Sequence, residues 1–152
     1  IWGNTYVYDS TIVGAGTYGV YDHVSGWRNA GIRLYNTVIA GSGTSDVYQD
    51  SQGTLQFCDY VATSDSSAAC GENTETYSLT GITSADLSYT TGFLTSGSDL
   101  IDVGYDYSST TGSSGDIQGD TFGASRDIGA DEYVATYFPF KQFNHGIMTG
   151  VF

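Results

Sequence analysis

Residues 5–13 read TYVYDSTIV, residues 32–40 read IRLYNTVIA and residues 55–63 read LQFCDYVAT, and the three stretches align without a gap. Each is a short run in which β-branched and aromatic residues alternate with smaller or polar ones. Runs that recur about every 20 to 50 residues are typical of solenoids, in which successive turns of the chain stack parallel strands. The repeat therefore predicts stacked parallel strands over residues 5–65.

One column of this alignment holds Asp9, Asn36 and Asp59, at spacings of 27 and 23 residues. Asn and Asp side chains hydrogen-bond nearby backbone groups at tight turns, so we interpret the column as a structural turn ladder. The unequal spacings assign residues 27–30 (WRNA) to a loop insertion in one turn of the solenoid. Repeat proteins place such insertions on one face, which is often the face that binds a partner.

The composition favours an all-β domain. The 152 residues are 39% apolar and include 21 Gly, 13 Tyr and seven Phe, but one Pro and one Met. Strong helix formers are scarce, whereas Tyr, Thr, Val and Ser crowd the alternating runs. The Gly and Ser content alone would suggest disorder, but the many aromatic residues argue for a folded core. No apolar run is long enough to span a bilayer.

The formal net charge is −13, and the four fixed cations are Arg28, Arg33, Arg126 and Lys141. A surface of this charge repels polyphosphates, so nucleic acid is not an expected partner. It suits a protein that stays soluble in a salty extracellular medium. Because Ile1 opens a strand-like segment without an initiator Met or a basic leader, we expect a piece processed from a longer polypeptide. Upstream residues or a neighbouring subunit would then cover its first strands.

The chain has two cysteines, Cys58 and Cys70. An even count in a chain of extracellular character favours a disulfide between them. The alternative is two independent thiols. A zinc site is not expected, because only His23 and His145 are available as further soft ligands and their spacing is not that of a ligand pair.

The C-terminal half contains three short motifs: residues 98–104 read SDLIDVG, residues 116–119 read DIQG and residues 126–133 read RDIGADEY. In this order they resemble the end of secreted right-handed parallel β-helix proteins of the pectate-lyase-like superfamily, in particular choice-of-anchor Q domain proteins. The resemblance implies a short right-handed parallel β-helix with a closing cap over residues 1–133. It implies no single activity, because that superfamily includes lyases, hydrolases, adhesins and viral spikes.

The acidic residues of these motifs have two interpretations. Carboxylates in loops of extracellular solenoids bind calcium, which is therefore the candidate cofactor. Alternatively, Asp side chains cap tight turns by accepting backbone N–H bonds, and an Arg pairs with one of them to close the last turn. We favour capping and expect no metal, because the spacing lacks the dense repeat of calcium-binding loops. The proposed cap residues are Asp102, Asp116, Arg126, Asp127 and Glu132.

A polysaccharide lyase or glycoside hydrolase is the alternative function. Two well-placed carboxyl groups suffice for glycoside hydrolysis, but 17 acidic residues make chance pairs unavoidable. The Asn-Thr-Asp and Gly-His-Gly elements of polygalacturonase-like hydrolases occur only in broken form, at residues 36–38 (NTV) and 144–146 (NHG). His23, next to Asp22, suggests half of a dyad, although isolated surface histidines are far commoner. We therefore assign no catalytic residue.

Tyrosines recur throughout the repeats and offer a second clue to function. Exposed aromatic rings on a flat β-face hold sugar rings or another protein's surface, whereas buried rings would form an ordinary core ladder. Solenoids use their elongated faces for recognition, which favours the first interpretation. The candidate residues for binding a glycan or a partner are Tyr6, Tyr8, Tyr35 and Trp27.

Residues 134–152 no longer resemble a repeat and are rich in aromatic residues. They form either a hydrophobic cap of the last turn or an arm that docks onto a partner, and we favour docking. The candidate assembly residues are Tyr137, Phe138, Phe140, Phe143 and Phe152.

These observations predict a non-catalytic structural or adhesive module. It would act outside the cell, on a cell surface or on a virion surface, and would associate with its own subunits or with a larger particle. Carbohydrate is a further candidate ligand.

Overall fold

The computed structural model is all-β, as the composition predicts. Helical structure among the described residues is limited to a 3-10 turn, η1 (Ser66–Ala68), and a four-residue helix, α1 (Ser108–Thr111). No helix in this part of the chain is long and apolar enough to cross a membrane. The residues that the structure describes are 4–23, 31–50, 57–68, 78–112, 114–123 and 125–134.

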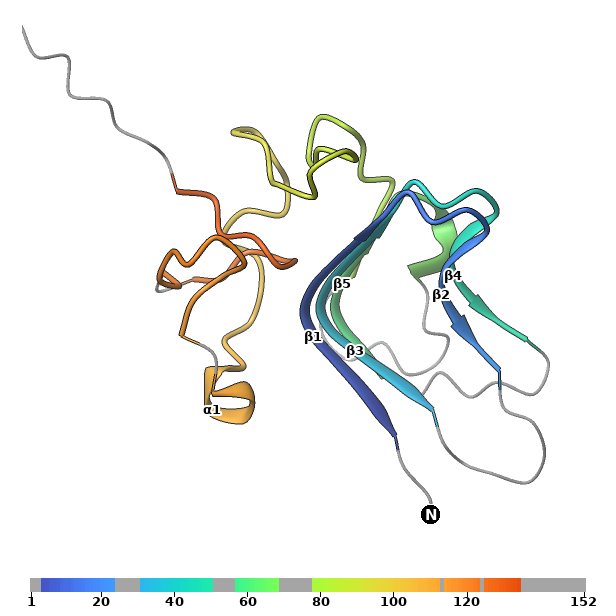
Figure 1. Cartoon of the computed structure of the whole chain (residues 1–152), viewed down its shortest axis with the longest axis horizontal. Helices are drawn as coiled ribbons and strands as arrows, with labels where there is room; N and C mark the ends of the chain where they lie inside the picture. The colour runs from blue at the N-terminus through green and yellow to red at the C-terminus, as the bar shows by residue number, and fades with distance from the viewer. Residues whose placement is uncertain are drawn as a thin grey trace, which may run out of the picture.

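In these described residues, six strands form two sheets, and every strand pair within the sheets is parallel (Figure 1). The larger sheet has the order β1-β3-β5-β6 and the smaller one pairs β2 with β4, so the first four strands alternate between the sheets. β1 pairs with β3, and β2 with β4, at one common offset of 27 residues. The strands are β1 (Thr5–Val13), β2 (Tyr18–Asp22), β3 (Ile32–Ala40), β4 (Ser45–Gln49), β5 (Phe57–Thr63) and β6 (Ser78–Thr80).

The larger sheet bends sharply along a column of left-handed residues, visible as the elbow of β1, β3 and β5 in Figure 1. The φ angles are 42° at Asp9, 44° at Asn36 and 55° at Tyr60. A left-handed residue interrupts the strict alternation of a strand. We call the face of the larger sheet that lies toward the smaller sheet its inner face. In β3, Leu34 packs on this inner face before the bend at Asn36, and Ile39 packs on it after the bend. The odd separation of these two residues shows that the alternation shifts by one at the bend.

The predicted column of Asp9, Asn36 and Asp59 is wrong at its third member. Asp59 pairs with Tyr35, and Tyr60 takes the left-handed position beside Asn36. The physical reason lies in the apolar residues, because this register places Cys58 beside Leu34 in the inner core, where both are fully buried. A shift of one residue would turn Cys58 to the opposite face.

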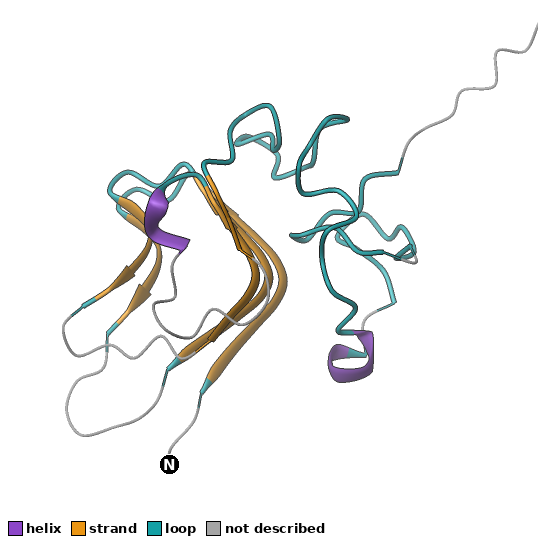
Figure 2. Ribbon diagram, turned by 180° about the vertical axis from the view of Figure 1, so that it is seen from behind, coloured by secondary structure: helices purple, strands orange, loops and turns teal. Residues whose placement is uncertain are grey.

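Other parts of the chain pack against both faces of the larger sheet. Its inner face packs against Val20 of β2 and Val47 of β4. On its outer face, Val38 and Ala40 contact apolar residues from the C-terminal loops, including Ile128. The views in Figures 1 and 2 agree that these loops and the smaller sheet lie on opposite sides of the larger sheet.

Residues 81–134 pack as a series of turns with little regular structure (Figure 2). Single antiparallel bridges connect Leu87 with Leu94 and Gly104 with Arg126. Ile128 N–H donates to the Leu100 carbonyl over 3.0 Å. The apolar side chains of these loops therefore cover the outer face of the sheet.

Cys58 is fully buried and disulfide-bonded. Cys70, the other cysteine of the chain, lies outside the described residues, so the pairing of the two remains a prediction.

Candidate functional site

The RDIGADEY segment, residues 126–133, docks directly onto the outer face of β1 and β3. Gly129 N–H donates to the Asn36 carbonyl over 3.0 Å. Ala130 N–H donates to Thr11 Oγ1 over 2.9 Å. Gly129 has a φ of +124°, and a Cβ there would lie 2.9 Å from Thr11 Oγ1 and 3.1 Å from Val38 Cγ2. The segment therefore approaches the sheet as closely as a residue without a side chain allows.

Arg126 occupies the centre of this contact and is only 2% exposed. Its Nη1 lies 3.2 Å from Asp9 Oδ2, and its Nη2 lies 3.1 Å from Asp106 Oδ1. The guanidinium carbon stands 3.4 Å from the centroid of the Phe122 ring. Hydrogen bonds from Ser108, with a further contribution from Arg126, hold the pKa of Asp106 below its usual value. Two carboxylates and an aromatic face thus compensate in part for the loss of water around the buried guanidinium group.

Further carboxyl groups tie the loops to one another. Asp127 accepts the N–H of Asp102 over 2.6 Å and the N–H of Tyr133 over 2.5 Å. Glu132 accepts the N–H of Asp127 over 3.2 Å, and the N–H of Glu132 donates to Asp116 Oδ2 over 3.0 Å. The proposed cap residues are therefore brought together, and the carboxyl groups of Asp116, Asp127 and Glu132 accept backbone N–H bonds in the manner of turn caps. Asp102 contributes its backbone N–H rather than its carboxyl group.

Burial raises the pKa of Glu132 to about 7 and also raises the pKa of Asp127. The charge of Asp127 adds to the effect on Glu132, whereas the hydrogen bond from Asp127 N–H and the positive charge of Arg126 oppose it. Among the described residues, no group of three His, Cys, Asp or Glu side chains is arranged to hold a metal ion.

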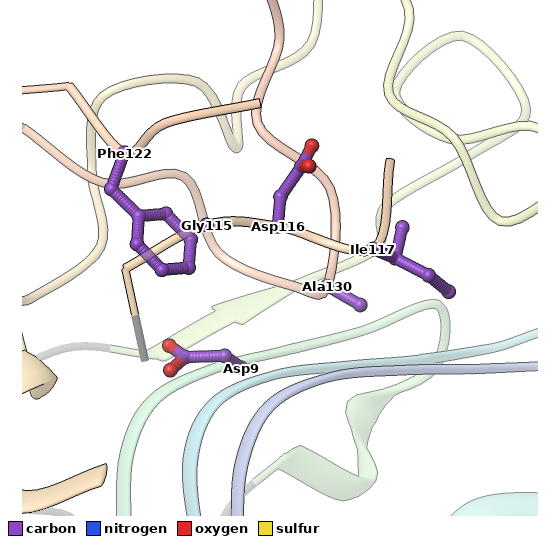
Figure 3. A pocket seen from close by; sticks show the side chains of 6 residues that line it. All are labelled: Asp9, Gly115, Asp116, Ile117, Phe122 and Ala130. Carbon is purple, nitrogen blue, oxygen red and sulfur yellow. The ribbon is translucent and has the colours of Figure 1, made fainter. Parts of the chain in front are cut away.

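A cavity of about 300 Å³ opens beside the buried Arg126 and is bounded by Asp9, Asp116 and Phe122 (Figure 3). The Asp9 carboxylate points toward the Phe122 ring, and the Asp116 carboxylate points in a different direction. Both groups already have structural donors. Asn36 Nδ2 donates to Asp9 over 2.9 Å, and Asp120 N–H donates to Asp116 over 2.8 Å. The cavity therefore does not present two unengaged carboxyl groups to a substrate.

The predicted tyrosines lie on the outer face of the larger sheet. The rings of Tyr8 and Tyr35 stack with their centroids 4.8 Å apart. Tyr107 packs its edge against Tyr35 at 5.1 Å and donates its hydroxyl to Asp59 over 2.9 Å. Burial, and this contact with Asp59, raise the pKa of Tyr107. The inner part of the column is therefore a packed ladder, whereas Tyr6 at its end remains 50% exposed.

A second set of tyrosines lies on the smaller sheet and was not predicted as a site. The Tyr48 ring stacks on Tyr18 at 4.5 Å and on Tyr21 at 5.6 Å. His23 Nδ1 contacts the carboxylate of Asp50, so the acidic partner of His23 is not its neighbour Asp22. The 27-residue repeat contained the signal for this arrangement, because Tyr21 pairs with Tyr48 at the same offset that separates His23 from Asp50.

Within the described part of the chain, both sheets have an unpaired edge at the same end. Among the described residues, no strand pairs with the outer edge of β1 or of β2. None of the nine residues of β1 is buried, whereas Leu34, Val38 and Ile39 in β3 are fully buried. On these edge strands lie Tyr8, which stacks on Tyr35, and Tyr21, which stacks on Tyr48. We call this surface, formed by β1 and β2, the open end.

Several predicted site residues lie outside the described part of the chain. They are Trp27, Tyr137, Phe138, Phe140, Phe143 and Phe152.

Comparisons of the chain with protein-family models, with curated proteins and with solved structures gave no match.

Proposed function

We propose that the chain is a non-catalytic structural or adhesive module. It is a short right-handed parallel β-helix that associates, through its open end, with copies of itself or with a larger extracellular or virion-surface particle. The β-helix is supported by the common offset of 27 residues between β1 and β3 and between β2 and β4, because the strands of one coil keep the same spacing to those of the next coil. The passage of the chain from one sheet to the other and back supports it too.

The observation that carries the proposal is the open end. An edge strand presents a row of unpaired backbone N–H and C=O groups, and monomeric proteins protect such edges with charges, proline or very short strands. β1 has nine residues, contains no Lys, Arg or Pro, and has a single acidic residue, Asp9, whose charge is compensated by Arg126. The strand therefore has the properties of an edge that pairs with a further strand.

The hydrogen bonds of the carboxyl groups support a non-catalytic role. A general acid or base has to reach a substrate atom with an oxygen that is not otherwise engaged. Asp116 accepts three backbone N–H groups, and Asp127 accepts two. Using these groups in catalysis would release the turns that they cap.

Sedimentation velocity over a range of protein concentrations tests the proposal. We expect the chain to associate as its concentration rises, and the double variant Tyr6→Lys, Tyr21→Lys to associate about tenfold more weakly or not at all, because lysines block an edge. The matched control is Tyr105→Lys, since Tyr105 is 53% exposed, like Tyr6 and Tyr21, but stacks on Tyr60 of β5, away from the open end. A chain that remains a folded monomer at millimolar concentration would contradict the proposal.

One observation favours the alternative function, a polysaccharide lyase or glycoside hydrolase. Glu132, whose pKa is raised to about 7, lines a cavity of about 350 Å³ together with Asp131 and Asp120. A carboxylic acid that stays protonated near neutral pH is what a glycosidase uses as its general acid. Reducing-sugar release from a panel of neutral polysaccharides, lost in Glu132→Gln and retained in Asp120→Asn, would support this alternative.

A further inference from the structure

We infer that Tyr21 and Tyr48 form a site of oxidative modification, at which a one-electron oxidant of the peroxidase class joins the two rings into a dityrosine cross-link. The link connects β2 with β4 and so closes a loop of the chain by a covalent bond. This inference goes beyond the proposed function and does not depend on it, because the two residues face each other across a strand pair inside the described part of the chain.

The backbone holds the two rings together. Tyr21 and Tyr48 are register partners in the parallel pairing of β2 with β4. Their ring centroids lie 5.6 Å apart, and the ring planes differ by 20°. Neighbouring strands keep this spacing for as long as the sheet is folded, so the two phenols stay next to each other without having to meet by diffusion.

Both rings are also open to an oxidant. Tyr21 is 49% exposed and Tyr48 is 39% exposed. Tyr6 and Tyr105 are exposed as well, but the rings on which they stack are partly buried. Among the described tyrosines, Tyr21 and Tyr48 are therefore the exposed rings that stack on each other.

The coupling step balances with hydrogen peroxide as the oxidant. Each ring loses one electron and each hydroxyl loses one proton, which gives two phenoxyl radicals. The radicals form one bond between a Cε carbon of Tyr21 and a Cε carbon of Tyr48, and the hydrogen on each joined carbon moves to the phenolic oxygen. Two phenols are restored, and the two electrons and two protons that were removed reduce one peroxide to two waters. A haem peroxidase transfers the electrons one at a time.

An acceptor for the released proton lies beside Tyr21. The Tyr21 hydroxyl donates to Asp50 Oδ2 over 3.5 Å, and the same carboxylate contacts His23 Nδ1. Desolvation and the charge of Asp50 raise the pKa of Tyr21, so its hydroxyl stays protonated until the ring is oxidised. Asp50 is therefore placed to take up the proton when Tyr21 loses its electron.

Coupling within one chain is favoured over coupling between chains. Exposed side chains reorient within nanoseconds, so the two rings can turn from a stacked to an edge-to-edge arrangement during the life of a radical. Two separate chains each carry a net charge of −13 and repel each other. Once formed, the link restricts the unfolded chain as a disulfide does and should stabilise the strand pair.

Peroxidase treatment of the full chain at low concentration tests the inference. With a haem peroxidase and hydrogen peroxide, we expect an intact mass lower by two hydrogens, the fluorescence of dityrosine, and a cross-linked peptide pair that contains Tyr21 and Tyr48. The rate should not change with protein concentration, because the reaction is intramolecular.

Two variants make the assignment specific. Tyr48→Phe should lower the dityrosine yield at least about tenfold, because Phe has no hydroxyl and forms no phenoxyl radical, and the remaining tyrosines are not held as an exposed pair. The matched control is Tyr105→Phe, which removes a tyrosine of 53% exposure from a different stack and should retain the yield. In urea, the selectivity for Tyr21 and Tyr48 should disappear along with the sheet.

Three outcomes would overturn the inference. They are links spread evenly over several tyrosine pairs of the folded chain, covalent dimers whose formation rises with protein concentration, and oxidation of tyrosines without any dityrosine. Sedimentation of the untreated chain measures association separately, so these outcomes leave the proposed function untouched.

Discussion

Arg126 and Asp9 lie 117 positions apart in the chain and form an ion pair, with Arg126 Nη1 3.2 Å from Asp9 Oδ2. The contact joins the C-terminal segment to the first strand across the outer face of the sheet. Because Arg126 is almost fully buried, removing it would leave Asp9 without its cation, and removing one partner of a buried pair is far more costly than never forming the pair.

The Arg126→Ala variant should therefore be strongly destabilised, by about 3 to 5 kcal/mol. Urea denaturation followed by tyrosine fluorescence measures the loss. The matched control is Asp106→Asn, because Asp106 contacts the same guanidinium but its side chain is 63% exposed, so its removal should have a small effect. Equal losses in the two variants would show that the buried contact with Asp9 does not hold the segment.

Glu132 predicts a loss of stability as the pH rises from acidic to neutral. Its pKa rises from the usual 4.5 to about 7 in the folded chain, so the folded state binds this proton more tightly than the unfolded state. The stabilisation is complete below about pH 4.5 and is lost as the pH rises through about 7. Asp127, whose pKa is also raised, acts in the same direction.

The Glu132→Gln variant should remove most of this dependence, because Gln stays neutral and can still accept the N–H of Asp127. Thermal unfolding midpoints at intervals between pH 5 and 8.5 provide the measurement. If the variant and the original chain lose stability in parallel over that range, Glu132 is not the titrating group.

The sequence repeats predicted the parallel strands and, for the first two repeats, their register, because both follow from a local pattern of apolar residues. They did not predict the slip at the third repeat. Asn and Asp are the non-glycine residues best suited to a left-handed position, which favoured Asp59, yet Tyr60 takes it so that Cys58 can stay in the core. Tertiary packing outweighs a local preference at this position.

Only part of the candidate site could be predicted from the sequence, because many of its contacts are tertiary. The cap residues were found because they lie in compact motifs, but the contacts that join the C-terminal loops to the strands link residues far apart in the chain. Tyr105 contacts Asn36 across 69 positions, and Tyr107 contacts Asp59 across 48. Pairings at such separations leave no periodic signal in a single sequence, whereas the 27-residue repeat brought Tyr21 beside Tyr48 and could have identified that surface.

Gly129 should not tolerate a side chain. The Gly129→Ala variant combines a φ of +124° with a Cβ that would lie 2.9 Å from Thr11 Oγ1, so we expect a loss of about 2 to 4 kcal/mol. Gly119→Ala is the matched control, because its φ is +90° but nothing lies within 4 Å of the added Cβ. Denaturation of both variants separates the cost of packing from that of the backbone. A similar loss in the two would mean that residues 126–133 do not press against the sheet as described.

Asn36 provides a test of the left-handed column, because it is fully buried and contributes both its backbone angle and its side chain. Its Oδ1 accepts the N–H of Tyr105 over 2.9 Å, and its Nδ2 donates to Asp9 over 2.9 Å. In Asn36→Ala, a residue with a Cβ but no polar side chain has to adopt a φ of 44°, and the N–H of Tyr105 loses its acceptor. We therefore expect the free energy of unfolding to fall by about 3 kcal/mol. Asn36→Gly removes the same hydrogen bonds but suits the backbone angle, so it should be less destabilised by about 1 kcal/mol. Guanidinium denaturation of the two variants measures the difference, and a Gly variant no more stable than the Ala variant would show that the bend of the sheet does not depend on a left-handed residue at position 36.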